Sequence, residues 1–291
     1  MIEEFEAGKL PTEERWKKYI DELRKKAIPS TKEDVMRALV MAVEKRVPKE
    51  KFGLFLSGGV DSSLLAVLLK KFSDNFICYC VGITGSKDVA AAKQLAEQFK
   101  LNLKYKEYSI EEVEEPLQKA ARILKTDNCI AIGVASVVIA AAELAQQDGI
   151  KIFFGGLGSE EIFAGYERHE KVHDVNDECW RGLREMWARD LARDAAVGSA
   201  LGIGVRVPFL DDELIKVAMG IPGSRKIDAE HRKIILREIA EEFGLPKELA
   251  WRPKQAAQYG SGFDKAMRKL AKRKRITQNV YAQMLADRIK R

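Results

Sequence analysis

Residues 52–65 read FGLFLSGGVDSSLL, and this stretch decides the fold. Its first five residues form a short apolar run bounded by turn residues, which is typical of a buried β-strand. A serine and two adjacent glycines follow, and the apolar spacing over 64–69 then predicts a helix. A strand that ends in a glycine pair and turns directly into a helix exposes backbone N–H groups at the positive end of the helix dipole. Such a turn is suited to hold phosphate.

The same alternation of strand and helix repeats along the chain. The apolar runs over 75–83 and 150–154 and the segment 102–108 predict three more strands, and the segments 86–99 and 130–147 between them have helical patterns. Strands that alternate with helices pair in parallel through right-handed crossovers. We therefore expect an α/β fold with a doubly wound parallel sheet.

The segments that flank this core are predicted to be helical. Residues 11–27 carry apolar side chains at helical spacing, and Ser30-x-x-Glu33 resembles a capping box that begins a second helix. After residue 160 the strand signals fade, and helices are expected over 177–201, 211–219, 229–243 and 262–290. We divide the chain into N-terminal helices packed on the core (1–48), a central domain (49–265) and a basic C-terminal helix (266–291).

Composition indicates a globular protein. Of the 291 residues, 46% are hydrophobic and 32% are charged. No apolar run reaches the length of about 20 residues that spans a bilayer, and the acidic N-terminus lacks the pattern of a signal peptide. The four cysteines have the spacing of neither a disulfide framework nor a zinc site and are expected to be reduced: Cys78, Cys80, Cys129 and Cys179. We expect a cytoplasmic protein without membrane contact.

The net charge of +6 has its excess near the C-terminus. The residues concerned are Lys269, Lys272, Arg273, Lys274, Arg275, Arg288, Lys290 and Arg291. A basic cluster can neutralise the phosphates of a nucleic acid, but a solvated helix face explains it equally simply, and we favour that interpretation. The spacing of His169 and His173 could hold zinc on a helix, yet no third ligand is near them in the sequence.

The turn over 57–63 resembles the PP-loop, SGGxDS, of the N-type ATP pyrophosphatases, which cleave ATP between the α and β phosphates. It is neither a Walker A loop nor a dinucleotide-binding G-x-G-x-x-G pattern. Later segments narrow the resemblance to the asparagine synthetases. In that family's order they are Gly156–Tyr166 (GLGSEEIFAGY), Arg206–Asp211 (RVPFLD), Lys233–Arg237 (KIILR) and Trp251–Lys254 (WRPK). The resemblance covers about residues 50 to 265 and implies an adenine nucleotide alpha hydrolase-like fold with a helical C-terminal portion.

The resemblance also implies roles for individual residues. The PP-loop residues Ser57, Gly58, Gly59, Ser62 and Ser63 would hold the ATP phosphates, and Arg252 and Lys254 the departing pyrophosphate. Phe55, Val81, Gly155 and Gly156 would form the adenosine pocket. Asp61 and Glu160 would hold Mg²⁺, which prefers hard carboxylate oxygens. Lys233, Glu161 and Arg237 would be catalytic, Lys233 by neutralising charge that builds on the phosphates.

Some positions depart from the family. Residue 2 is Ile where the glutaminase domain of the family has its cysteine nucleophile, and the segment before Ser57 is too short for that domain. Leu157 stands where the family has the glutamate assigned to amide formation, and a leucine can neither accept a proton nor orient an amine. Gly204 replaces an acidic residue, and Gln258–Gly262 resembles the stand-alone relatives instead.

We therefore expect an ATP-dependent, amide-forming ligase that uses ATP and Mg²⁺. It would adenylate a carboxylate, aspartate before others, release pyrophosphate, and use ammonia or a separate glutaminase subunit as the nitrogen source. A homodimer is left open. A PP-loop enzyme that modifies RNA and a non-catalytic ATP-binding relative are alternatives, favoured by the basic C-terminal region and by Leu157, respectively.

Overall fold

The computed structural model describes residues 1–253 and 256–287. Its centre is one parallel sheet of five strands in the order β3-β2-β1-β4-β5. The strands are β1 (Phe52–Phe55), β2 (Phe76–Ile83), β3 (Leu103–Tyr108), β4 (Ile152–Phe154) and β5 (Gly204–Arg206). The strand order reverses between β1 and β4, which confirms the predicted doubly wound α/β sheet.

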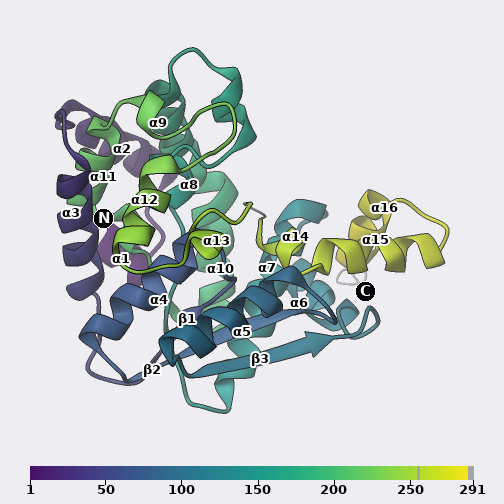
Figure 1. Cartoon of the computed structure of the whole chain (residues 1–291). Coiled ribbons are helices and arrows are strands. Elements are labelled where there is room, and N and C mark those ends of the chain that lie inside the picture. The colour runs from purple at the N-terminus through teal and green to yellow at the C-terminus, as the bar shows by residue number, and fades with distance from the viewer. Residues whose placement is uncertain (254–255, 288–291) are drawn as a thin grey trace.

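Helices cover both faces of this sheet, and further helices lie at the N-terminal and C-terminal ends of the chain (Figure 1). In the N-terminal half they are α1 (Ile2–Glu6), α2 (Glu13–Lys25), α3 (Lys32–Glu44), α4 (Val60–Phe72), α5 (Lys87–Phe99), α6 (Glu114–Leu124) and α7 (Cys129–Gln146). After β4 come α8 (Ser159–Ile162), α9 (Val175–Met186), α10 (Ala192–Leu201), α11 (Asp212–Gly220), α12 (Ile234–Glu242), α13 (Lys247–Ala250), α14 (Ala257–Gly260), α15 (Phe263–Arg273) and α16 (Gln278–Asp287). A π-helical turn, Trp187–Leu191, joins α9 to α10.

The core has two layers because successive strand residues point to opposite faces. In β2, Cys78 and Cys80 pack into the cluster that contains α3, α4 and α5, whereas Ile77 and Tyr79 pack into the cluster that contains α6 and α7. The cysteines are free, as expected for reduced thiols. The fully buried β2 explains why its sequence is a continuous apolar run.

Several details differ from the sequence-based expectation. The short β5 lies between two predicted helices, where no strand was expected, and α6 was not predicted at all. The capping box of α3 is formed by Thr31 and Asp34, one residue later than Ser30 and Glu33. Helix α12 begins only at Ile234, because an antiparallel bridge between Ile227 and Arg232 precedes it.

Helix α7 is long and apolar enough to cross a membrane by length and composition alone. Its 18-residue window has a mean hydropathy of 1.9, and half of that window is buried inside the fold. The helix packs against α6, α10 and β2. A single such helix is weak evidence for a membrane span, since the core helix of a globular fold meets the same criteria.

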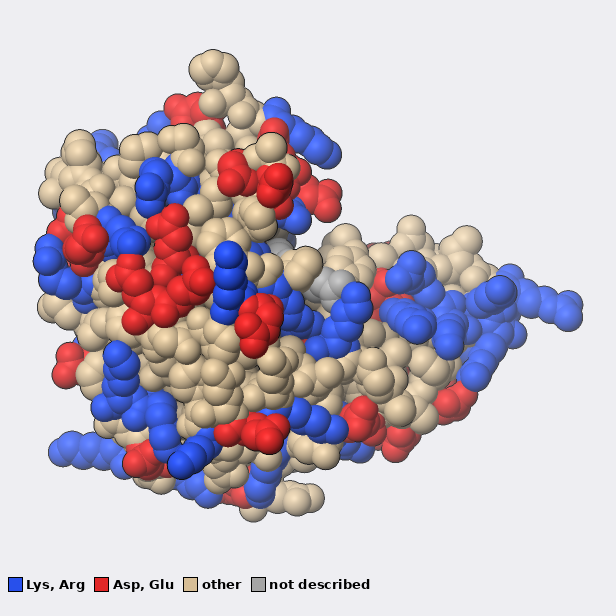
Figure 2. All heavy atoms as spheres, in the orientation of Figure 1, with Lys and Arg blue, Asp and Glu red and all other residues tan. Residues whose placement is uncertain are grey.

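The flanking helices pack on different parts of the core. Helix α2 packs on α9, and α3 packs on α4 and α11, while α15 and α16 pack on α6 and α7 on the other side of the molecule (Figure 1). Figure 2 shows Lys and Arg side chains gathered over the α15–α16 end. Part of this charge is paired, because Arg268 binds Asp264 and Arg273 binds Glu111. The two boundaries between the three predicted segments remain predictions.

Candidate active site

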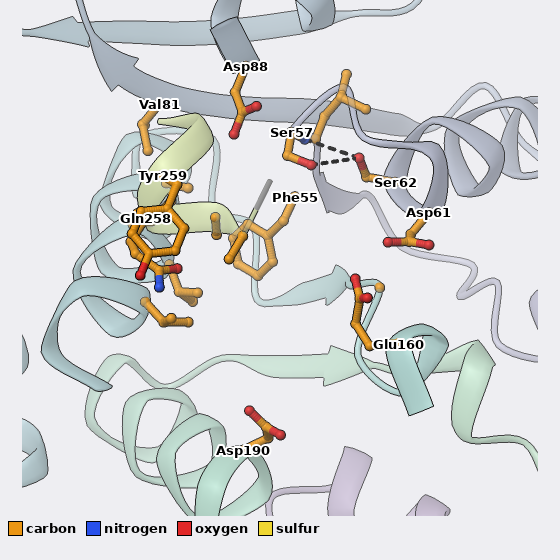
Figure 3. A pocket seen from close by; sticks show the side chains of 18 of the residues that line it. Phe55, Ser57, Asp61, Ser62, Val81, Asp88, Glu160, Asp190, Gln258 and Tyr259 are labelled. Carbon is orange, nitrogen blue, oxygen red and sulfur yellow. Dashed lines mark hydrogen bonds between the residues drawn. The ribbon is translucent and has the colours of Figure 1, made fainter. Parts of the chain in front are cut away.

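The candidate site lies where the strand order reverses, beyond the carboxyl ends of β1 and β4. This is the position at which open α/β sheets bind ligands. A cavity of about 510 Å³ opens there, lined by the loop after β1, the end of β2, and side chains from α7, α8, α10 and α14 (Figure 3). The phosphate-binding turn predicted from residues 57–63 therefore borders this cavity.

Hydrogen bonds within the turn after β1 fix its shape. The Ser57 N–H donates to Ser62 Oγ at 3.1 Å, and the Gly59 N–H donates to Ser57 Oγ at 3.3 Å. Gly58 has φ +66°, and a Cβ there would lie 2.5 Å from the Cβ of Ala91, so only glycine fits. Helix α4 has no side-chain cap at its N-terminus. The turn is thus preformed in a shape suited to hold phosphate.

Lys233 is brought to this turn from a distant part of the chain. It is 0% exposed, and its Nζ donates to both carboxylate oxygens of Asp61 and to Glu160 Oε1, each at 2.7 Å, and to Ser159 Oγ at 3.1 Å. Burial by itself would lower the pKa of Lys233, but the two carboxylates outweigh this effect and hold the pKa above its ordinary value. Three of the predicted residues therefore meet in one charged cluster.

The backbone conformation at Lys233 and the missing side chain at Gly165 make room for this cluster. Lys233 itself has φ +58°, a left-handed conformation that is uncommon for residues other than glycine. A Cβ on Gly165 would lie 1.7 Å from Glu160 Oε2 and 2.4 Å from Lys233 Cε. Gly165 therefore leaves the space that the two side chains fill.

Arg252 lies across the same turn. Its Nη1 donates to the Ser57 carbonyl at 3.2 Å, and its Nη2 donates to Asp88 Oδ1 at 3.0 Å. Burial raises the pKa of the Asp88 carboxyl to about 6, although Arg252 opposes this change. Asp88 was not singled out from the sequence. Lys254, the other predicted pyrophosphate ligand, lies outside the described residues.

The hydrogen bonds of Arg237 within the described part of the chain go to backbone carbonyls. Arg237 is buried, and its guanidinium donates to the carbonyls of Arg232 (2.7 Å), Ala250 (2.6 Å) and Arg252 (3.0 Å). Burial lowers its pKa. Because two of these carbonyls belong to Ala250 and Arg252, Arg237 supports the segment that carries Arg252. Arg237 also borders a small cavity beside the PP-loop.

Glu161 belongs to a second polar cluster, whose other members line the cavity. Its Oε1 accepts hydrogen bonds from Tyr166 Oη at 2.9 Å and from Arg189 Nη2 at 2.6 Å. Burial, reinforced by the charge of Asp190, raises the pKa of Glu161 to about 7. Arg193 donates to Asp190 at 3.1 Å.

The second cluster was largely missed by sequence reasoning. Tyr166, Arg189, Asp190 and Arg193 all line the cavity. Their signal was the Arg-Asp-x-x-Arg spacing over 189–193, which places charged residues on one face of an otherwise mixed helix.

Three of the four predicted adenosine residues line the cavity. Phe55 and Val81 line it, and Phe55 stacks on Phe153 with ring centroids 4.4 Å apart. Gly156 lines it beside Asp61, while the Gly155 N–H donates to the Arg206 carbonyl at 3.0 Å.

The positions that depart from the family, and the histidine pair for which a zinc site was considered, have the following surroundings. Leu157 is partly buried and packs against the core, and Gly204 lies in β5, where a Cβ would lie 3.1 Å from the Glu6 carbonyl oxygen. His169 is buried, and its Nδ1 accepts a hydrogen bond from the Tyr166 N–H. Within residues 1–253 and 256–287, no group of three or more His, Cys, Asp or Glu side chains is arranged to hold a metal ion.

The strand order, the glycine-paired turn at the reversal point and the lysine between two carboxylates define a PP-loop type of α/β nucleotide-binding protein. The family model described as asparagine synthase matches residues 34–177 and 169–288. The chain therefore belongs to the asparagine synthase family.

Individual relatives agree with this assignment. A protein named as an asparagine synthetase (glutamine-hydrolyzing) of Methanocaldococcus jannaschii is 34% identical over 92% of this chain and 57% of its own length. Asparagine synthetase B of Escherichia coli is 28% identical over 80% of this chain and 45% of its own length. The chain thus spans about half the length of the curated relatives it matches. Among solved structures, an NMN synthetase from Francisella tularensis has 14% sequence identity and a TM-score of 0.46. The match covers 88% of this chain and 86% of the NMN synthetase chain.

Proposed function

We propose that this protein is an ATP-dependent ligase that adenylates a carboxylate and then forms an amide. One observation carries the proposal: the buried Lys233 ammonium lies between Asp61 and Glu160, next to the phosphate cradle and at the wall of a cavity of about 510 Å³. Family membership supports the same class of reaction.

The residues of the cradle have separable tasks in this reaction. Backbone N–H groups at the start of α4 and the Ser57 and Ser62 hydroxyls bind phosphate oxygens. A substrate carboxylate oxygen attacks the α-phosphorus, the bond to the β-phosphate oxygen breaks, and pyrophosphate leaves with the electron pair. Lys233 and Arg252 provide positive charge beside the phosphates while that charge develops.

The acidic pair fits a magnesium ion. Asp61 and Glu160 present carboxylate oxygens to the same point, and hard oxygen ligands are those that Mg²⁺ prefers. Two carboxylates are too few for a complete shell, so the ATP phosphates and water would supply the other ligands. A bound magnesium ion would neutralise phosphate charge, and Lys233 would share the carboxylates with it.

The second cluster supports an amino acid as the carboxylate substrate, with aspartate as the first candidate. Arg189 and Arg193 both pair with Asp190, and together they give this part of the cavity charges of both signs. An amino acid carries an ammonium and a carboxylate, so its binding site needs charges of both signs. Ammonia would then attack the acyl carbon of the adenylate and yield the amide, AMP and a proton.

The decisive measurement is pyrophosphate release from ATP and Mg²⁺, screened with each amino acid, with and without ammonium and with glutamine as a separate arm. Release that depends on aspartate, with asparagine formed only when ammonium is present, is the expected result. Asparagine formation with glutamine as the only nitrogen source would require a glutaminase activity in the preparation.

One other function is favoured by a specific observation, the apolar packing of Leu157. A non-catalytic relative would bind ATP through the cradle without turning it over. ATP that raises the melting temperature, while no carboxylate elicits pyrophosphate release, would replace the ligase proposal with this one.

A further inference from the structure

Gln258 is a buried amide without a complete set of hydrogen bonds. It lies on α14, is 4% exposed, and lines the cavity of the candidate active site. Its Oε1 is buried and accepts no hydrogen bond from any residue within 1–253 or 256–287. A buried amide carbonyl without a donor is costly, so such a group in a cavity wall indicates that a ligand supplies the partner.

The segment around Gln258 is held firmly against the sheet. The Ile83 N–H at the end of β2 donates to the Ser261 carbonyl at 2.8 Å. Gly260 packs directly on the Asp88 carboxylate, and the Gln258 side chain lies against Gly133 of α7. Because these contacts come from three elements, β2, α5 and α7, the amide has a defined position in the cavity.

That position is at the far end of the cavity from the phosphate cradle. Figure 3 shows Gln258 and Tyr259 beside Val81, with Phe55 between them and the side of the cavity that carries Asp61 and Glu160. A nucleotide whose phosphates lie in the cradle would extend past Phe55 and bring its base to Gln258. Ile130 and Val134 of α7 also line the cavity and add apolar surface suited to a flat ring.

We propose that Gln258 recognises the base of the nucleotide by accepting a hydrogen bond from the 6-amino group of adenine. A glutamine amide carries an acceptor and a donor side by side, and adenine presents its amino group next to a ring nitrogen in the complementary order. Rotation about χ3 lets the amide turn its oxygen toward the ligand. Gln258 is then a specificity-determining residue for adenine, an inference that rests on the proposed use of ATP.

The test is a calorimetric titration with ATP and with purine riboside triphosphate, which lacks only the 6-amino group, in the presence of Mg²⁺ and without a carboxylate substrate. The wild type is expected to bind ATP about 5- to 30-fold more tightly than the analogue, as one well-placed buried hydrogen bond implies. Gln258→Met keeps the length of the side chain but removes the amide, and should bind both nucleotides with the lower affinity.

The matched control is Gln146→Met, the same chemical change at an exposed position near the end of α7, which should retain the ATP preference. Thermal melts of each variant report whether it is folded. A preference for ATP that survives in Gln258→Met, or a wild type that binds both nucleotides equally, would overturn the role of Gln258 and leave the ligase proposal standing. A wild type that binds neither nucleotide would overturn both.

Discussion

Lys226 and Lys233 lie seven residues apart on one short segment, and both are 0% exposed, yet their surroundings are opposite. The segment closes on itself, because the Ile234 N–H donates to the Lys226 carbonyl at 2.9 Å. Lys233 reaches into the active-site cavity region and meets two carboxylates. Lys226 meets none among the described residues; its Nζ lies 3.6 Å from Met219 Sδ, near Cys179.

The two environments move the two pKa values in opposite directions. Asp61 and Glu160 hold the pKa of Lys233 above its ordinary value despite burial. Burial lowers the pKa of Lys226 to about 8, and the nearby Cys179 opposes this only weakly. Burial therefore does not mark a functional lysine in this protein. What distinguishes Lys233 is the pair of carboxylates that keep it charged beside the phosphate cradle.

The largest expected effect is on catalysis at Lys233. Lys233→Met keeps the chain length and removes the charge, so pyrophosphate release should fall about 10²- to 10³-fold, the usual cost of losing one preorganised electrostatic group. Lys226→Met is the matched control, since it makes the same change at an equally buried position, and its rate should remain within about twofold of the wild type. An equal loss in both variants would mean that Lys233 acts through folding.

The phosphate cradle and the surroundings of Lys233 could be predicted from the sequence because their signals are local. A strand, a glycine pair and a helix follow one another within 52–69, and the acidic motif over 156–166 is likewise continuous. The parallel sheet followed from the alternation of such units. Even Lys233 was found, since it stands in the short motif KIILR.

What the sequence could not show depends on contacts between distant segments. The three residues of β5 carry no strand pattern of their own and become a strand only by pairing with β4. Arg237 reads as a catalytic cation, but its partners are backbone carbonyls that the fold brings to it. The buried amide of Gln258 and the burial of Lys226 are visible only once neighbouring helices are in place.

The second effect tests whether the carboxylates account for the difference. Replacing both of them, with Asp61→Asn and Glu160→Gln, should give Lys233 the environment of Lys226 and cost about 3–5 kcal/mol of unfolding free energy near pH 7. In the wild type the raised pKa of Lys233 adds stability that is fully present below the unfolded pKa and is lost as pH rises through the folded pKa.

In the double variant this dependence should change sign, and stability should increase from neutral pH toward pH 10. Urea unfolding across this range measures both quantities. Adding Lys233→Met to the double variant should restore much of the lost stability, because no buried charge remains. A double variant as stable as the wild type at pH 7 would show that the ion pairs contribute little to holding Lys233.

The smallest effect concerns Lys226, and here the substitution should stabilise the protein. The pKa of Lys226 falls from 10.5 to about 8 on folding, so below pH 8 a proton is bound in both states and the folded state bears the cost of a buried charge. Lys226→Met removes that cost and should raise the free energy of unfolding by about 2–3 kcal/mol at pH 7, since a tenfold change in a protonation equilibrium corresponds to about 1.4 kcal/mol. The gain should shrink as pH rises from 8 to 10.5, because the wild-type lysine then folds in its neutral form. Urea unfolding of the two proteins at pH 7 and pH 10 measures it, and a gain that is equal at both would show that the methionine stabilises by packing and not by removing a charge.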